Sequence, residues 1–145
     1  MKKKKKDLDI IGWREWVSFP ELGIKTIKAK IDTGARTSAL HVSHIRVVKG
    51  TNIVKFKIHP VQRRSRPVIE ASAKMVNRRE IKSSNGEISV RPVIITKIKI
   101  GEKILPIELS LVNRDLMGFR LLLGRSALKN HFIVDSGKSF LLLKE

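Results

Sequence analysis

The chain contains many short runs in which apolar and polar residues alternate, and this pattern limits the folds that it can adopt. A period of two places successive side chains on opposite faces of a strand, and the runs are rich in the β-branched residues that strands favour. They cover residues 27–31, 54–58, 94–100 and 107–111. Turn signals separate them at Asn85-Gly86, Gly101-Glu102 and Asp135-Ser136-Gly137. Many short strands with close turns predict an all-β fold, either a barrel or a sandwich.

The C-terminal part of the chain carries the one predicted helix and a last apolar run. The helix spans residues 126–130, with Ser126 as its candidate N-cap. Residues 140–143 are consecutive and apolar, which favours a strand that is buried on both faces. This strand would either fold back on residues 132–134 as a hairpin or join a sheet with a second copy of the chain. The basic segments at 62–66 and 77–79 are predicted to be loops.

The length of 145 residues fits one domain, which we place at residues 10–145 after a disordered basic tail at residues 1–9. Two catalytic lobes of ordinary size do not fit this length, so chemistry that needs two symmetric halves requires a second chain. The chain has no cysteine, which excludes disulfides, thiolate zinc sites and thiol catalysis. No apolar run reaches the roughly 20 residues of a membrane span, and no secretory signal follows the lysine run. We therefore expect a cytoplasmic protein with no membrane partner.

Charge is the strongest bias in the composition. The chain has 31 Lys and Arg against 13 Asp and Glu, a formal net charge of +18. This balance predicts an anionic partner, which could be nucleic acid, a ribosome, an anionic surface or an acidic polypeptide. The alternative is a solvated basic surface with no specific partner. Aromatic residues make up only 5% of the chain, so stacking platforms for single-stranded nucleic acid are scarce.

The segment Asp32-Thr33-Gly34-Ala35 follows directly on an apolar strand and is the first candidate for chemistry. Gly34 allows a sharp turn after the acid, and Thr33 can brace the loop with its hydroxyl. The alternative is that Asp32 only turns the chain, as Asp often does in Asp-x-Gly stretches. A second segment favours a chemical role for Asp32, because the apolar run at 121–123 is followed by Gly124-Arg125 just before the predicted helix.

Together and in this order, the two segments resemble retropepsins, in which an apolar-apolar-Gly segment packs across the Asp-Thr-Gly loop and Gly-Arg opens a short helix. The resemblance implies a closed or partly open barrel of the acid-protease type, in which Asp32 is catalytic and Thr33 and Gly34 hold its loop. The residues that support the loop would be Leu122, Leu123, Gly124 and Arg125. The residues that contact substrate would be Ala35, Arg36 and, at the tip of a flap hairpin, Asn85 and Gly86.

One position departs from the retropepsin pattern. Many retropepsins place a second acid just after Asp-Thr-Gly-Ala, where it pairs with the arginine of Gly-Arg, but this chain has Arg36 there. Arg125 then needs another acid, and Asp115 is the candidate. Arg36 would lie near the substrate cleft and would favour an acidic substrate.

A closer resemblance covers nearly the whole chain after the lysine tail. The residues at 11–15, 28–42, 81–84, 86, 113–115 and 121–125 resemble a bacterial family named as ATP-dependent zinc proteases. The same family is described as a retropepsin-like aspartic endopeptidase domain, and its members are often associated with a ligase that adds glutamates to a ribosomal protein.

The zinc and ATP parts of that family name have little support in the residues. The chain has no His-Glu-x-x-His segment and no phosphate-binding loop of the Gly-x-x-x-x-Gly-Lys type. His41 and His44 are three residues apart and are the candidate metal ligands, but two ligands do not make a site. No cofactor is therefore predicted.

These observations predict an aspartic endopeptidase that forms its active site as a homodimer, with one Asp32 from each chain, and that cleaves an acidic, glutamate-rich protein. A non-catalytic basic module on the same fold, which binds RNA, a ribosome or acidic tails, is the alternative. A zinc-dependent peptidase is the third option.

Overall fold

The computed structural model describes residues 8–82, 85–114, 116 and 118–142, and these residues form a mainly β fold with one short α-helix. The predicted fold class is therefore confirmed. The elements in chain order are β1 (Asp9–Ile11), β2 (Arg14–Phe19), the 3-10 helix η2 (Pro20–Leu22), β3 (Ile24–Ile31), β4 (Ser38–Val47), β5 (Ile53–Ile58), β6 (Ile69–Lys82), β7 (Ile88–Ile100), β8 (Lys103–Val112), β9 (Leu121–Leu123), α1 (Arg125–Leu128) and β10 (Phe132–Val134). Within the described part of the chain, no helix is long and apolar enough to cross a membrane.

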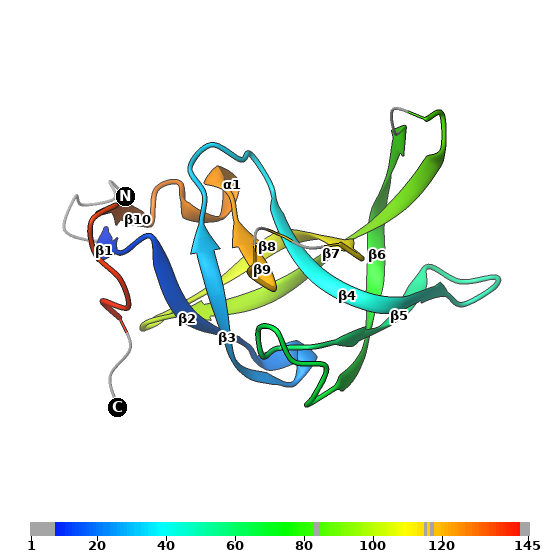
Figure 1. The fold of residues 1–145 in the computed structure, drawn as a ribbon, viewed down its shortest axis with the longest axis horizontal. Helices are drawn as coiled ribbons and strands as arrows, with labels where there is room; N and C mark the ends of the chain where they lie inside the picture. The colour runs from blue at the N-terminus through cyan, green and yellow to red at the C-terminus, as the bar shows by residue number, and fades with distance from the viewer. Residues whose placement is uncertain (1–7, 83–84, 115, 117, 143–145) are drawn as a thin grey trace, which may run out of the picture.

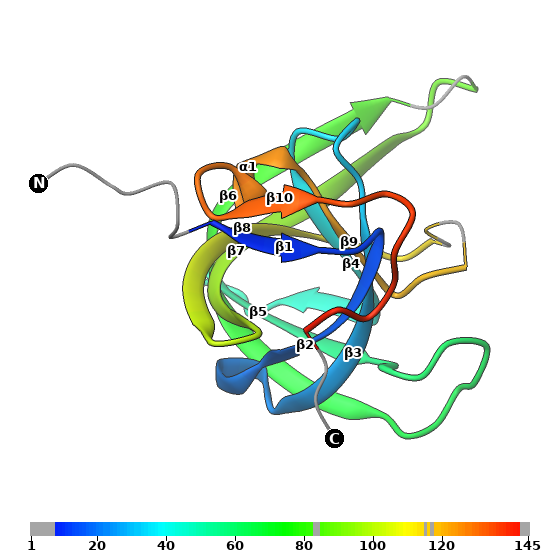
Figure 2. The ribbon, with the colours of Figure 1, turned by 90° about the vertical axis from the view of Figure 1, so that its left-hand side faces the viewer.

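The large sheet returns on itself through its strand pairings. Its strands follow the order β2-β3-β9-β4-β5-β6-β7-β8, and β2 also pairs with β7 while β4 also pairs with β8. One closed ring of pairings therefore runs β2-β3-β9-β4-β8-β7, and a second runs β4-β5-β6-β7-β8. Figure 1 shows the strands crossing around a common interior, and Figure 2 shows the same curvature from the side.

The interior of these rings is the hydrophobic core, and the alternating pattern of each strand explains which side chains enter it. In β3, Ile27, Ala29 and Ile31 are buried, whereas Lys28 and Lys30 are half-buried on the other face. The largest fully buried side chains come from β1 to β5 and β7 to β9 and include Phe19, Leu40, Ile58, Ile94, Ile98, Leu109, Leu111 and Leu121. Burial of such aliphatic groups contributes roughly 1.5–3 kcal/mol each, so the alternation that predicts the strands also stabilises them.

Most predicted strands and turns agree with the structure, and one predicted loop is wrong. β7 and β8 meet at the predicted Gly101-Glu102 turn, and residues 62–66 form a loop between β5 and β6. The predicted loop at residues 77–79 instead lies within β6, where Asn77 pairs with Val93 of β7. The helix begins at Arg125, one residue before its predicted start, and ends at Leu128.

The predicted hairpin at the C-terminal segment is also wrong, whereas pairing of this segment with a second copy of the chain stays a prediction. β10 pairs in parallel with β1, so residues 132–134 form no hairpin with the residues that follow, and 140–142 are not a strand. The reason lies in Glu15 of β2, whose fully buried carboxylate accepts the N–H groups of Leu141 and Leu142 at 2.9 and 3.1 Å. Leu143 and residues 1–7 of the predicted tail lie outside the described residues, and β1 begins at Asp9.

Candidate active site

Asp32 lies immediately after the last residue of β3, where β9 fixes the backbone. β9 runs parallel to β3 with Ile31 opposite Leu123, and it also pairs in an antiparallel sense with β4. The N–H of Asp32 donates to the carbonyl oxygen of Leu123 at 2.8 Å, so the strand pairing extends to the acid itself. The carboxylate is therefore held at the edge of the core on a rigid element, and its side chain is only half-buried.

A tight turn orients the carboxylate of Asp32. Its Oδ1 accepts the N–H of Gly34 at 2.9 Å, and its carbonyl oxygen accepts the N–H of Ala35 at 3.2 Å. A hydrogen bond from a backbone N–H fixes the direction of a carboxylate. The arrangement therefore presents a carboxylate of defined orientation to the surroundings of the loop.

The start of α1 holds the rest of this loop. The N–H groups of Arg125 and Ser126 donate to the carbonyl oxygens of Ala35 and Arg36 at 2.7 and 3.0 Å. Arg125 also donates from Nη1 to the carbonyl oxygen of Thr33 at 3.0 Å. The guanidinium and the backbone N–H of Arg125 therefore both bind carbonyl oxygens of the Asp32 loop.

Gly124 is required by close packing between these two segments. Its N–H donates to Ser38 Oγ at 3.1 Å, and both residues are buried. A Cβ atom at this position would lie 2.5 Å from the carbonyl oxygen of Thr37, which no real Cβ contact tolerates. Because the obstacle is backbone rather than a side chain, any larger residue must displace the strand or the loop.

Comparisons with known proteins agree with this geometry. Residues 10–145 match the model of a family described as RimB-like, retropepsin-like aspartic endopeptidase RimB. The chain belongs to this RimB-like family.

Individual relatives add two facts about the family. Two proteins named "Probable alpha-L-glutamate ligase", from Shewanella halifaxensis and Shewanella pealeana, are each 47% identical over 92% of the chain. The chain spans only 30% of the length of these curated relatives. A solved Legionella pneumophila protein of unknown function (DUF785) is 28% identical, with a TM-score of 0.77 over 93% of this chain and 98% of that protein.

Most site residues expected for a RimB-like retropepsin come together in the structure. Leu123, Gly124 and Arg125 contact the loop that holds Asp32 through the hydrogen bonds described above, and Leu122 lies opposite Lys30 in the same pairing. Asp115, the acid predicted to pair with Arg125, lies outside the described residues. Sequence reasoning missed Ser38, because a single serine at the start of a strand carries no signal of the remote backbone that it binds.

Basic side chains surround the Asp32 loop. Arg36 is exposed and borders two hollows, one of about 830 Å³ that also includes Arg125 and Lys129, and one of about 550 Å³ that includes Arg79. Arg79 comes from β6, and its Nη1 lies 3.4 Å from Thr37 Oγ1. These residues give the neighbourhood of the carboxylate a positive potential, which attracts acidic groups.

The predicted flap is the hairpin formed by β6 and β7. Its turn contains Gly86, which has a φ of +87°, and Asn85, whose Oδ1 accepts the N–H of Glu87 at 3.2 Å. In both ribbon views the tip of this hairpin stands away from the loop between β3 and β4 of the same chain (Figures 1 and 2). Within one chain, the hairpin approaches that loop through Arg79.

The two candidate metal ligands have separate neighbours. His41 Nδ1 lies 2.8 Å from the carbonyl oxygen of Arg114, and His44 Nδ1 lies 3.0 Å from Ser43 Oγ. Among the described residues, no three His, Asp or Glu side chains are grouped closely enough to hold a metal ion. His41 and His44 therefore do not form a ligand set with described side chains.

A second Asp-x-Gly turn offers an internal comparison. Asp135 Oδ1 accepts the N–H of Gly137 at 3.1 Å, much as Asp32 Oδ1 accepts that of Gly34. Both Asp135 and Gly137 are exposed, and this turn follows the short strand β10 rather than a strand of the large sheet. The local turn is thus the same at the two acids, and each acid also donates its N–H to a neighbouring parallel strand, because the N–H of Asp135 binds the carbonyl oxygen of Ile11 at 2.8 Å. The difference is α1, whose residues Arg125 and Ser126 hold the Asp32 loop.

Proposed function

We propose that this chain is an aspartic endopeptidase whose active site contains two Asp32 carboxylates, one from each chain of a homodimer. The observation that carries the proposal is the Asp32 turn, held by β9 and α1 in a chain of the RimB-like retropepsin family. Among the described residues, Asp32 is the one acid of an Asp-x-Gly turn that α1 holds, so a second such carboxylate has to come from a second copy.

The chemistry follows from the proximity of two like charges. Two carboxylates a few ångströms apart do not ionise together easily, so they share one proton. The ionised carboxylate takes a proton from a water molecule, which attacks the carbonyl carbon of the peptide bond. The protonated carboxyl group donates a hydrogen bond to the developing oxyanion, and a proton is then transferred to the leaving amine.

We propose further that the substrate is rich in glutamate. Arg36, Arg125 and Lys129 border the hollow beside the Asp32 loop, and Arg79 borders its neighbour. The curated relatives, of which this chain spans about a third, are named for the ligation of L-glutamate. A peptidase that acts on the same protein as such a ligase would cleave the glutamate residues that the ligase adds.

The test is cleavage of a glutamate-rich peptide by wild type, Asp32→Asn and Asp135→Asn, each with and without a chelator. Asp32→Asn keeps the shape of the side chain but removes the base, so we expect hydrolysis to fall to the background rate. Asp135→Asn alters the matching turn at 135–137 and should retain full activity. Cleavage by Asp32→Asn at the wild-type rate in the presence of chelator would refute the proposal.

The two-chain mechanism has its own test. Mixing wild type with Asp32→Asn lets subunits exchange, and only dimers with two intact carboxylates should cleave. Activity should therefore fall with the square of the wild-type fraction. A linear fall, or sedimentation of active protein as a monomer, would show that one chain is sufficient.

A further inference from the structure

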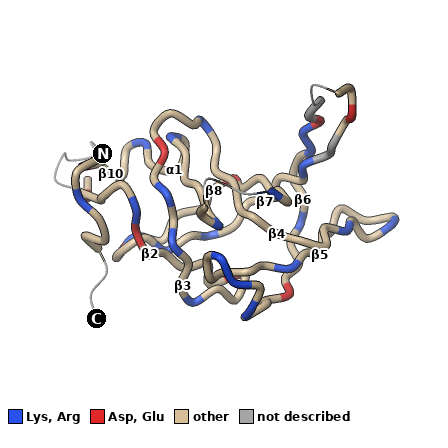
Figure 3. The backbone as a smooth tube through the Cα atoms, in the orientation of Figure 1, with Lys and Arg blue, Asp and Glu red and all other residues tan. Residues whose placement is uncertain are grey.

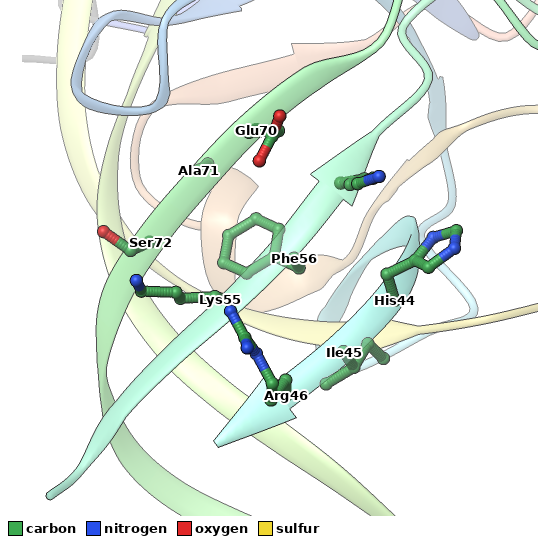
Figure 4. A pocket seen from close by; sticks show the side chains of 9 residues that line it. His44, Ile45, Arg46, Lys55, Phe56, Glu70, Ala71 and Ser72 are labelled. Carbon is green, nitrogen blue, oxygen red and sulfur yellow. The ribbon is translucent and has the colours of Figure 1, made fainter. Parts of the chain in front are cut away.

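A second basic site lies on the sheet formed by β4, β5 and β6. It is an open hollow of about 720 Å³, bordered by His44, Arg46, Lys55, Lys57, Glu70 and Ser72, with Phe56 among its lining residues (Figure 4). Ser38 begins β4 beside the Asp32 loop, and Arg46 lies roughly 26 Å farther along that strand if it is fully extended. The hollow is therefore separate from the candidate active site.

The cations of this hollow are arranged at a cost to the fold. Arg46 of β4 lies directly opposite Lys55 of β5, and Figure 4 shows their side chains next to each other. Like charges in directly opposed positions destabilise a sheet. Glu70 lies opposite Lys57, yet neither Arg46, Lys55 nor Lys57 forms an ion pair with a described carboxylate. The fold itself gains nothing visible from placing Arg46 opposite Lys55.

An irregularity of the backbone occurs at the same place. The pairing of β4 with β5 shifts register between Ser43 and Arg46, and His44 within the shift has a φ of +54°. Bulges of this kind redirect side chains and are over-represented next to functional sites. The bulge and the opposed cations are independent observations, and both mark the same hollow.

The hollow suits a polyanion that is bound through side chains alone. β5 is paired with β4 on one edge and with β6 on the other, so an extended peptide that binds over Lys55 and Lys57 cannot do so as a further strand next to β5. Phe56 is only 2% exposed and offers no face on which an unpaired base could stack. What remains is a set of cations that can contact phosphates, as in recognition of a double helix by its backbone.

We infer that this hollow binds the phosphate backbone of double-stranded RNA. Arg46, Lys55 and Lys57 contact phosphates. Ser72 and His44 supply hydrogen-bonding groups at the same surface, which suit the 2′-hydroxyls that distinguish RNA from DNA. Basic residues are spread over the whole chain (Figure 3), so the test has to separate this site from overall charge.

The experiment measures binding of a labelled RNA duplex by fluorescence anisotropy over a series of salt concentrations. The test variant carries Arg46→Gln, Lys55→Gln and Lys57→Gln, and the matched control carries Lys25→Gln, Lys97→Gln and Lys99→Gln. All six positions lie on strands, and each variant lowers the net charge of +18 by three. A DNA duplex of the same sequence and a polyglutamate competitor complete the set.

We expect the test variant to bind RNA at least about tenfold more weakly, with the slope of log affinity against log salt reduced by roughly 2–3. The control should change both quantities much less, and Asp32-dependent hydrolysis should be unchanged in either variant. Equal losses in the two variants, equal affinity for DNA, or no RNA binding by wild type would each overturn the inference. Polyglutamate that occupies the hollow in place of RNA, with the same sensitivity to the test variant, would assign the site to an acidic polypeptide instead.

Discussion

The buried carboxylate of Glu15 gives the sharpest test of how the C-terminal segment is held. Glu15 is 0% exposed, and its Oε2 accepts the N–H groups of Gly12 and Leu141 at 2.7 and 2.9 Å. Its Oε1 accepts the N–H of Leu142 at 3.1 Å. Phe140 adds a stacked contact with Trp16 at a ring separation of 5.6 Å. The segment is thus attached to β2 by this acid, by the aromatic pair and by Arg14, whose carbonyl oxygen accepts the N–H of Phe140 at 3.0 Å.

The substitution Glu15→Gln keeps the shape and removes the charge. With the amide oxygen in the place of Oε2, the amide N–H₂ faces the N–H of Leu142, and a buried donor left unsatisfied costs about 1–3 kcal/mol. The two remaining bonds weaken by roughly 1 kcal/mol each, because a neutral acceptor replaces a charged one. A neutral amide is also less costly to bury, which offsets part of this loss. The expected net destabilisation is about 2 kcal/mol.

Thermal unfolding followed by circular dichroism measures this effect. For a chain of this size, about 2 kcal/mol corresponds to a fall in Tm of roughly 4–8 °C. Glu102→Gln, at an exposed turn position, is the control and should leave Tm unchanged. An unchanged or higher Tm for Glu15→Gln would mean that the cost of burying the charge exceeds the value of its three hydrogen bonds, and the reasoning would fail.

Two further predictions concern the candidate active site. Gly124→Ala should lower Tm and reduce peptidase activity, because its Cβ meets the backbone of Thr37. The fall in Tm should correspond to a destabilisation of about 1–3 kcal/mol or more. Gly137→Ala is the control and should change neither quantity, because a Cβ there makes an ordinary 3.6 Å contact. Arg36→Gln should raise KM for a glutamate-rich peptide a few-fold at low salt, with a smaller change at high salt, whereas Lys25→Gln should not. Steady-state kinetics at two ionic strengths measure this, and equal KM values for wild type and Arg36→Gln at low salt would count against an acidic subsite.

The sequence predicts the strands that are buried on one face, because their period of two is visible. β7 ends at Ile100, where its alternation ends, although it begins at Ile88, before the alternating run at 94–100. The Asp32 loop is recognisable because two motifs occur in the expected order. Residues 77–79 lack this signal, since Asn77 and Arg78 are both exposed and the run has no apolar side. The apolar run at 140–143 predicts a strand, but its described part is placed by Glu15, a remote acid whose burial depends on the complete fold.

The position of β9 between β3 and β4 determines when the chain can complete the Asp32 loop during folding. Arg125 and Thr33, joined by a hydrogen bond, are 92 residues apart in the sequence. Contacts of such separation form late, because the entropy of closing a long loop must be overcome first. During synthesis, Asp32 leaves the ribosome long before Leu123 and Gly124, so the nascent chain carries the acid without its support. Each new molecule therefore acquires a supported carboxylate only when its domain is nearly complete, and newly made chains lack the bonded Asp32 loop until then.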